Sequence, residues 1–198
     1  MTPLSIVFSD PLAEFLGALP ARGTFRYTYD DVVKLAGHSC PTVAGAFLMT
    51  AAAMRALYPG GTPVRGEIEV IVGGEHDGTS SGPMSQVFTF LTGAATDSGF
   101  AGLAERWRRR GLLRFDPSLA GRVRFRRLDD GTAVDIGYQP GRVPPSGELR
   151  SVMARALGEQ ASLDELARFR ELWMARVGEI LASDPARVLE VTSVVETR

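Results

Sequence analysis

Two short motifs contain the residue types that can bind a metal ion or act as a nucleophile. The first is Gly37-His38-Ser39-Cys40-Pro41, which holds the only cysteine of the chain. A thiolate and an imidazole two residues apart can both reach one soft or borderline metal ion. Backbone N–H groups at a helix start favour a negative charge such as a thiolate, and Pro41 fits a first helical turn. His38 and Cys40 are therefore a candidate binding site. The pair alone is also compatible with a structural role, in which Cys40 is a small buried apolar residue and His38 hydrogen-bonds a loop.

The second motif lies in a glycine-rich loop after an apolar strand and contains His76, the only other histidine, beside Asp77. Loops at strand ends commonly carry sites, and these two side chains together with His38 and Cys40 form a donor set that suits zinc. The alternative is a solvated turn in which Asp77 and the following glycine supply turn geometry. Gln86, one turn into the next helix, is either an orienting group for a ligand or cofactor or an ordinary surface amide.

The elements that position these motifs follow from hydrophobic spacing and from helix start and stop signals. Residues 42–58 read as a long helix, apolar almost all round and rich in alanine and glycine, which is typical of a helix buried in a core or a subunit interface. Residues 66–73 read as a strand. A helix then starts at Pro83 and stops at Gly93.

The remaining segments predict short helices at residues 11–19 and from Tyr29 onward, and two strands at 122–128 and 133–138 joined by an Asp130-Gly131 turn. Two amphipathic helices follow, at 148–157 and 163–181, and then a strand at 187–195. This order predicts an α+β fold in which a mixed or antiparallel sheet packs against the buried small-residue helix, with helices toward the C-terminus. We expect one domain over residues 1–198.

Composition narrows the functional classes. With 198 residues, 44% apolar content and a net charge of −1, the chain is typical of a globular domain and gives no reason to expect nucleic acid or an anionic membrane as partner. The first 19 residues do not resemble a signal peptide, and no apolar run approaches the roughly 20 residues that a membrane span needs. We expect a cytoplasmic protein.

Arginines gather at residues 106–110 and 122–127. The first cluster is expected at a helix end and the second on the exposed face of a strand. Because acidic residues are abundant elsewhere, these clusters indicate a solvated surface and not a nucleic-acid interface.

The ordered series of motifs resembles the FmdE-like family, named after the E subunit of formylmethanofuran dehydrogenase, over residues 30–182, the expected core. The matching elements are Gly37-His38-Ser39-Cys40-Pro41 before a small-residue helix, an aspartate-containing loop after the strand, Gln86-Val87, and Leu91-Thr92-Gly93. The arginine-rich hairpin and the helix at 163–181 are similar to the family's later half. The resemblance implies a site at His38 and Cys40, and an association with a molybdenum or tungsten C1 dehydrogenase, which the fold alone does not justify.

The chain departs from the family at positions where members often carry further ligands. Ala36 and Ala94 stand where a histidine and a cysteine are common, and the loop at residues 79–81 lacks a cysteine. The cysteine-rich tail of some members is also absent. The resemblance therefore implies an open site, in which His38, Cys40 and either Asp77 or His76 leave a position for water or a small-molecule ligand.

Three other functions stay open. A haem-binding protein would use His38 or Cys40 as an axial ligand. A cofactor-free thiol enzyme would use Cys40 as the nucleophile and His38 or His76 as the base, with His76 favoured because residues two apart pair only across a specific bend. A non-catalytic partner protein would use the small-residue helix as an interface, and the same helix leads us to expect a homodimer.

Overall fold

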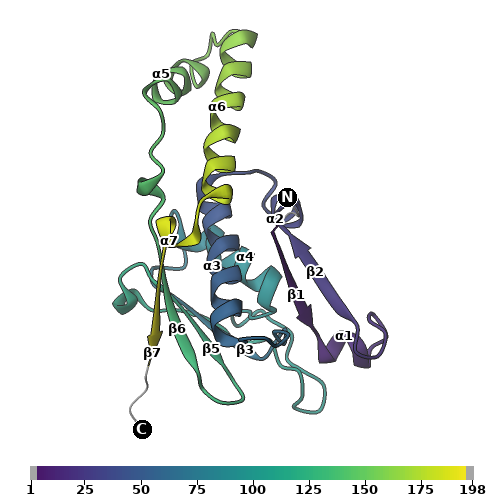
Figure 1. The fold of residues 1–198 in the computed structure, drawn as a ribbon. Coiled ribbons are helices and arrows are strands. Elements are labelled where there is room, and N and C mark those ends of the chain that lie inside the picture. The colour runs from purple at the N-terminus through teal and green to yellow at the C-terminus, as the bar shows by residue number, and fades with distance from the viewer. Residues whose placement is uncertain (1–3, 195–198) are drawn as a thin grey trace.

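The computed structural model, which describes residues 4–194, contains a five-stranded mixed sheet and a separate two-stranded hairpin (Figure 1). The sheet has the strand order β4-β3-β5-β6-β7, in which β3 and β4 are parallel and the other pairs are antiparallel. Its strands are β3 (Ile68–Val72), β4 (Leu113–Phe115), β5 (Val123–Arg127), β6 (Ala133–Tyr138) and β7 (Leu189–Val194). The hairpin pairs β1 (Ser5–Ser9) with β2 (Thr24–Thr28). The α+β class that the sequence predicted is confirmed.

Seven α-helices and two 3-10 turns connect these strands in the described part of the chain. The α-helices are α1 (Pro11–Phe15), α2 (Tyr29–Ala36), α3 (Pro41–Leu57), α4 (Ser81–Thr92), α5 (Gly147–Ala156), α6 (Leu163–Ala182) and α7 (Pro185–Val188), and the 3-10 turns are η1 (Pro117–Leu119) and η2 (Pro140–Arg142). Figure 1 shows α5 and the first half of α6 projecting from the body as an arm. None of the helices between residues 4 and 194 is long and apolar enough to cross a bilayer.

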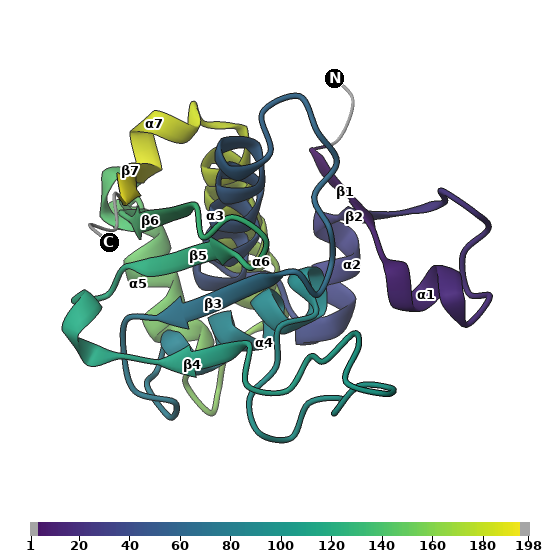
Figure 2. The ribbon, with the colours of Figure 1, turned by 90° about the horizontal axis from the view of Figure 1, so that it is seen from below.

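Helix α3 is the centre of the core. Figures 1 and 2 both place it between β7 and the β1–β2 hairpin, and the helix is buried along most of its length. The reason for its small residues is visible at Gly45, because the ring of Tyr138 from β6 lies directly on the helix backbone there. A Cβ at position 45 would lie 2.6 Å from Cζ of that ring, and closer to two other ring atoms. Only glycine permits this contact.

Capping chemistry accounts for several helix ends. Asp31 accepts hydrogen bonds from the backbone N–H and the hydroxyl of Thr28, at 2.9 and 2.8 Å, at the start of α2. The capping box predicted at the start of α6 is present, since Ser162 Oγ accepts from the backbone N–H of Glu165 at 3.2 Å and its own backbone N–H donates to that carboxylate. Gly93, which the sequence marks as a stop signal, ends α4 in the left-handed region at φ 77°.

One face of the sheet carries cross-strand ion pairs. Arg124 of β5 lies opposite Asp135 of β6 and donates to it at 2.7 Å. Arg126 lies opposite Glu69 of β3 and donates to it at 2.8 Å. Directly opposite pairs of unlike charge stabilise a sheet by about 0.2–1 kcal/mol each. Arg124 and Arg126 are therefore paired with carboxylates of the same face.

Several elements differ from the predictions. The β1–β2 hairpin and β4 were not predicted, and α4 starts at Ser81, two residues before Pro83. The segment at 187–195 begins inside the short helix α7 before it becomes β7, and its last residue lies outside the described part. The helix at 11–19 ends at Phe15, whose side chain is 62% exposed. That ring packs against Trp107, with centroids 4.5 Å apart, and does not join the core.

The arginines at 106–110 are not at a helix end. They lie in a loop in which Trp107 adopts a positive φ of 57°, and one of them, Arg109, is only 6% exposed. Arg109 donates to Asp10 at 2.7 Å, and Arg65 donates to the other carboxylate oxygen at 3.0 Å. The prediction of a solvated surface is therefore wrong for Arg109. This side chain is buried because Asp10, which is distant in the sequence, provides the countercharge.

Candidate functional site

The loop between α2 and α3 carries the first predicted motif. Helix α2 ends at Gly37, whose φ of 72° is left-handed and allows the chain to turn sharply. Three residues later Cys40 is the N-cap of α3, and Pro41 takes the first helical position as the sequence predicted. The motif thus lies at the start of the central helix.

Cys40 has its sulfur among the free backbone donors of the α3 N-terminus. Sγ accepts a hydrogen bond from the backbone N–H of Val43 at 3.4 Å, and the residue is half-buried. Helix N-termini carry partial positive charge and attract anionic groups. Since the thiolate is the form that binds metals and attacks electrophiles, this geometry suits either role.

His38 is exposed, and its ring is held by one local hydrogen bond. Nδ1 lies 3.0 Å from the backbone carbonyl oxygen of Ala36. A carbonyl oxygen only accepts, so Nδ1 must carry the proton. In the tautomer that makes this hydrogen bond, Nε2 has a free lone pair. Metal-binding histidines are typically held in this way, with one ring nitrogen donating to a carbonyl and the other available to the ion.

Three aromatic side chains from different elements hydrogen-bond the loop around Cys40. The Tyr29 hydroxyl of α2 lies 2.9 Å from Oγ of Ser39. Trp173 of α6 donates from Nε1 to the carbonyl oxygen of Ser39 at 2.8 Å. Tyr138 of β6 donates from its hydroxyl to the carbonyl oxygen of Pro41, also at 2.8 Å. The loop is therefore anchored on both sides of the cysteine.

Both tyrosine hydroxyls remain protonated at neutral pH. Burial raises the pKa of Tyr138 well above its ordinary value, and burial also raises the pKa of Tyr29, against the opposing effect of the hydrogen bond with Ser39. The phenols position the loop and do not act as bases near neutrality.

The second predicted motif lies in the loop between β3 and α4. His76 and Asp77 are exposed, and the ring of His76 meets the edge of Phe115 with centroids 6.3 Å apart. Gln86 is exposed on α4 and lines a surface hollow of about 410 Å³ together with Leu35 and Thr96. Neither loop residue shows a hydrogen bond that would hold it toward Cys40 in the described part of the chain.

The four predicted metal ligands do not assemble into one site. Within residues 4–194, no three or more histidine, cysteine, aspartate or glutamate side chains come close enough to hold a metal ion. His76 and Asp77 therefore do not complete a set with His38 and Cys40, because they lie on a loop after β3 whereas the other pair lies at the start of α3. At this loop, the described part of the chain provides at most two metal ligands, His38 and Cys40.

Sequence reasoning did not identify Tyr29, Tyr138 and Trp173 as part of this region. They come from three elements and meet the loop only through the tertiary fold, and aromatic residues at these positions read as ordinary core residues. No model of a known protein family matches the chain, and no curated protein matches it in sequence.

Proposed function

We propose that the loop at residues 37–41 binds a transition-metal ion, zinc in the first place, through Nε2 of His38 and Sγ of Cys40. The hydrogen bond between Nδ1 of His38 and the carbonyl oxygen of Ala36 carries this proposal, because the tautomer that makes it leaves Nε2 available as a ligand. Imidazole and thiolate are both preferred zinc ligands. With two protein ligands the site is open, and water, a small molecule or another protein completes the coordination.

The chain's own residues give this site its chemistry. The α3 N-terminus stabilises the anionic sulfur, and the three aromatic anchors hold the loop against rotation. A zinc ion with an open position would supply a polarised water or a Lewis acid. The resemblance to FmdE-like proteins supports the same two ligands, and the role is either enzymatic or accessory. A reducing compartment, the cytoplasm, fits a half-buried free thiol at this position.

The test is the metal content of purified protein. We expect about one zinc per chain in the unaltered protein and a loss of at least about tenfold in affinity for His38→Ala and for Cys40→Ser, because each removes half of the protein ligands. His76→Ala is the matched control, since it removes the other histidine and should leave zinc binding unchanged. A haem alternative uses the same residues and would show a Soret band on haem addition.

Three outcomes contradict the proposal. Protein that retains no zinc even after incubation with excess ion would remove it, as would zinc binding by the His38→Ala and Cys40→Ser variants that equals that of the unaltered protein. Zinc binding that is lost in His76→Ala would place the site in the other loop.

A second candidate is a thiol nucleophile, favoured by the hydrogen bond from the Val43 N–H to Sγ of Cys40. Under this proposal Cys40 reacts with iodoacetamide at neutral pH faster than a free cysteine does, because the helix N-terminus stabilises the thiolate. A rate at or below that of free cysteine would contradict it. If zinc slows the reaction of Cys40 with iodoacetamide, the metal and the reactive thiol belong to the same site.

Homodimerisation stays a prediction. The small residues of α3, which led us to expect it, have a role inside the chain. The small residues Ala44, Gly45 and Ala46 are buried inside the chain, where they make room for Tyr138 and for the sheet. They do not call for a second subunit. The mass in solution by light scattering decides the oligomeric state.

A further inference from the structure

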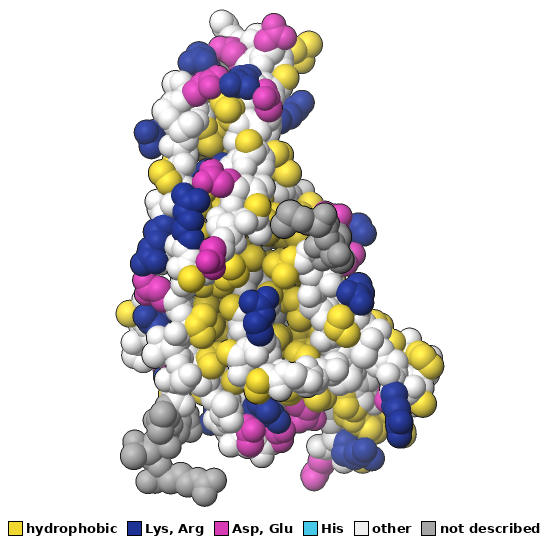
Figure 3. All heavy atoms as spheres, viewed as in Figure 1, with side chains coloured by type: hydrophobic (Ala, Val, Ile, Leu, Met, Phe, Trp, Pro, Cys, Tyr) yellow, Lys and Arg dark blue, Asp and Glu magenta, His cyan; other side chains and the backbone are white. Residues whose placement is uncertain are grey.

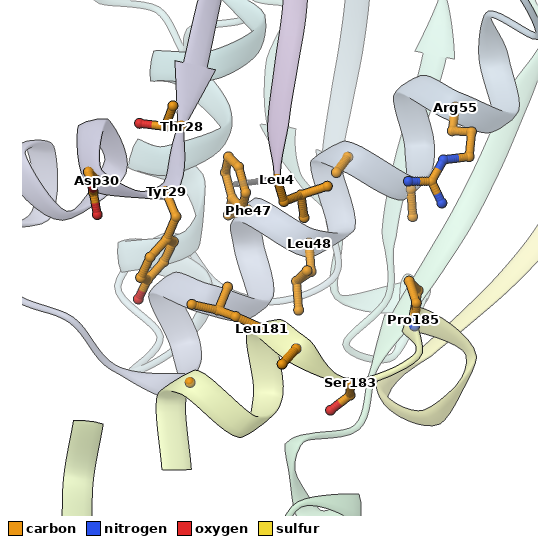
Figure 4. Close-up of a pocket in the computed structure, with 14 residues that line it drawn as sticks. Leu4, Thr28, Tyr29, Asp30, Phe47, Leu48, Arg55, Leu181, Ser183 and Pro185 are labelled. Atoms are coloured by element: carbon orange, nitrogen blue, oxygen red, sulfur yellow. The ribbon is translucent and has the colours of Figure 1, made fainter. Parts of the chain in front are cut away.

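A second feature of α3, separate from the loop at its start, is an apolar groove beside the exposed part of the helix. The groove has a volume of about 500 Å³, which lies within the usual range of small-molecule pockets. Its walls come from four places: the residue before β1, the start of α2, the middle of α3 and the C-terminal end of α6, as Figure 4 shows. The apolar lining includes Leu4, Phe47, Leu48, Ala51, Ala52 and Leu181.

The small side chains on α3 create this space. Ala51 and Ala52 are half-exposed toward the groove, unlike the buried alanines on the other faces of the helix. Larger residues at these two positions would fill the groove with the protein's own atoms. The apolar walls of an empty groove are in contact with water, which is unfavourable. A ligand with an apolar body would displace this water and cover the walls.

One basic residue provides the polarity of the groove. Arg55 is the only lysine or arginine in the lining, and its side chain has no hydrogen bond or ion pair with any residue in the described part of the chain. Figure 3 shows one basic side chain standing amid a mostly apolar face over α3. Asp30 lies at the opposite end of the groove from Arg55 in Figure 4. A ligand carboxylate is therefore attracted to one end and repelled from the other.

We propose that this groove binds an organic monocarboxylate with an extended apolar body, of the size and kind of a medium-chain fatty acid. The carboxylate pairs with the guanidinium of Arg55, whose planar donors match a carboxylate in a bidentate way. The hydrocarbon lies along Ala51, Ala52 and Leu48 toward Tyr29. The site does not depend on a metal at Cys40, although Tyr29 forms part of the wall and bonds Ser39 on its other side.

Calorimetric titration of the full chain with decanoate tests this proposal, with 1-decanol as the uncharged probe of equal length. We expect saturable binding of one decanoate per chain, at least about tenfold tighter than decanol. Arg55→Gln should weaken decanoate binding by about tenfold and leave decanol unchanged. Arg150→Gln is the matched control, because Arg150 is also an exposed helical arginine whose side chain has no partner in the described part. Ala52→Phe should abolish binding of both probes by filling the groove.

Equal affinity for decanoate and decanol, or equal decanoate binding by Arg55→Gln and Arg150→Gln, would overturn the proposal. So would the absence of saturable binding. A self-association in light scattering that Ala52→Phe removes would also overturn it, because a second copy would then occupy the groove. Loss of zinc in His38→Ala with unchanged decanoate binding would separate this site from the proposed function.

Discussion

Asp10→Asn is expected to lower the free energy of unfolding by about 3–5 kcal/mol, the largest effect of any single substitution considered for this protein. Asp10 is 4% exposed and is the countercharge of two arginines, Arg65 and Arg109. Asparagine keeps an oxygen that can accept from the first backbone N–H groups of α1, so helix capping is largely retained. The loss therefore comes from leaving a buried guanidinium without an anion.

The surroundings of Arg109 offer no substitute partner. Its Nη1 atom is buried and has no hydrogen-bond acceptor in the described part of the chain, and its guanidinium packs against the backbone of Gly66 and Gly93. Arg65 also holds the end of α4 by donating to the carbonyl oxygen of Leu91 at 3.2 Å. Removal of the carboxylate thus loosens the contacts between α1, the start of β3 and the end of α4.

Urea denaturation followed by circular dichroism measures this effect, with Asp184→Asn as the control. Asp184 is an exposed N-cap that accepts from the backbone N–H of Ala186 and has no ion pair in the described part, so the change there should stay within about 0.5 kcal/mol. A loss below about 1 kcal/mol for Asp10→Asn would show that the buried ion pair is not a main stabilising element.

Gly45→Ala and Gly178→Ala are expected to change stability in opposite directions. Both glycines lie inside long helices, where alanine is normally favoured by about 0.5–1 kcal/mol. A Cβ at Gly178 would meet no atom within 4 Å, so this substitution should stabilise the protein by that amount. A Cβ at Gly45 would overlap the Tyr138 ring, so we expect a net loss of about 1–3 kcal/mol from forced repacking.

The Gly45→Ala substitution is also expected to affect the candidate site. Displacement of Tyr138 would lengthen its hydrogen bond to the carbonyl oxygen of Pro41, next to Cys40. Thermal unfolding of the two variants gives the stability changes, and iodoacetamide labelling reports any change in thiol exposure. Stabilisation by Gly45→Ala would contradict the account of why α3 carries small residues.

The parts of the fold with strong local signals were predictable from the sequence. The bounds of β6 match the predicted segment, because an aspartate-glycine turn precedes this strand. Helix α3 begins and ends within one residue of its prediction, because a proline marks its start and glycines follow its end. The capping box of α6 is a contact between residues three apart. By contrast, β4 is three residues long and exists only through its parallel pairing with β3, a contact that no local pattern encodes.

The same distinction applies to charge and to the site. Arg109 and Asp10 are separated by 99 residues, so nothing near either one indicates that they form a buried pair. The positions of His38 and Cys40 at the start of a helix followed from Pro41 and the apolar run. The anchors from Tyr138 and Trp173 did not, since β6 and α6 meet this loop only through packing. The grouping with His76 and Asp77 failed for the same reason, because proximity between two loops is a tertiary property.

The most direct measurement of the central claim, that His38 and Cys40 hold one ion, is a Co²⁺ titration of the purified chain followed by absorption spectroscopy. A cobalt–thiolate bond gives a near-ultraviolet charge-transfer band, and Cys40 is the only cysteine that can produce it. We predict a band that saturates at one equivalent, disappears in Cys40→Ser, weakens in His38→Ala and is displaced by zinc. A titration without that band, or one in which His38→Ala leaves the cobalt affinity unchanged, would contradict it.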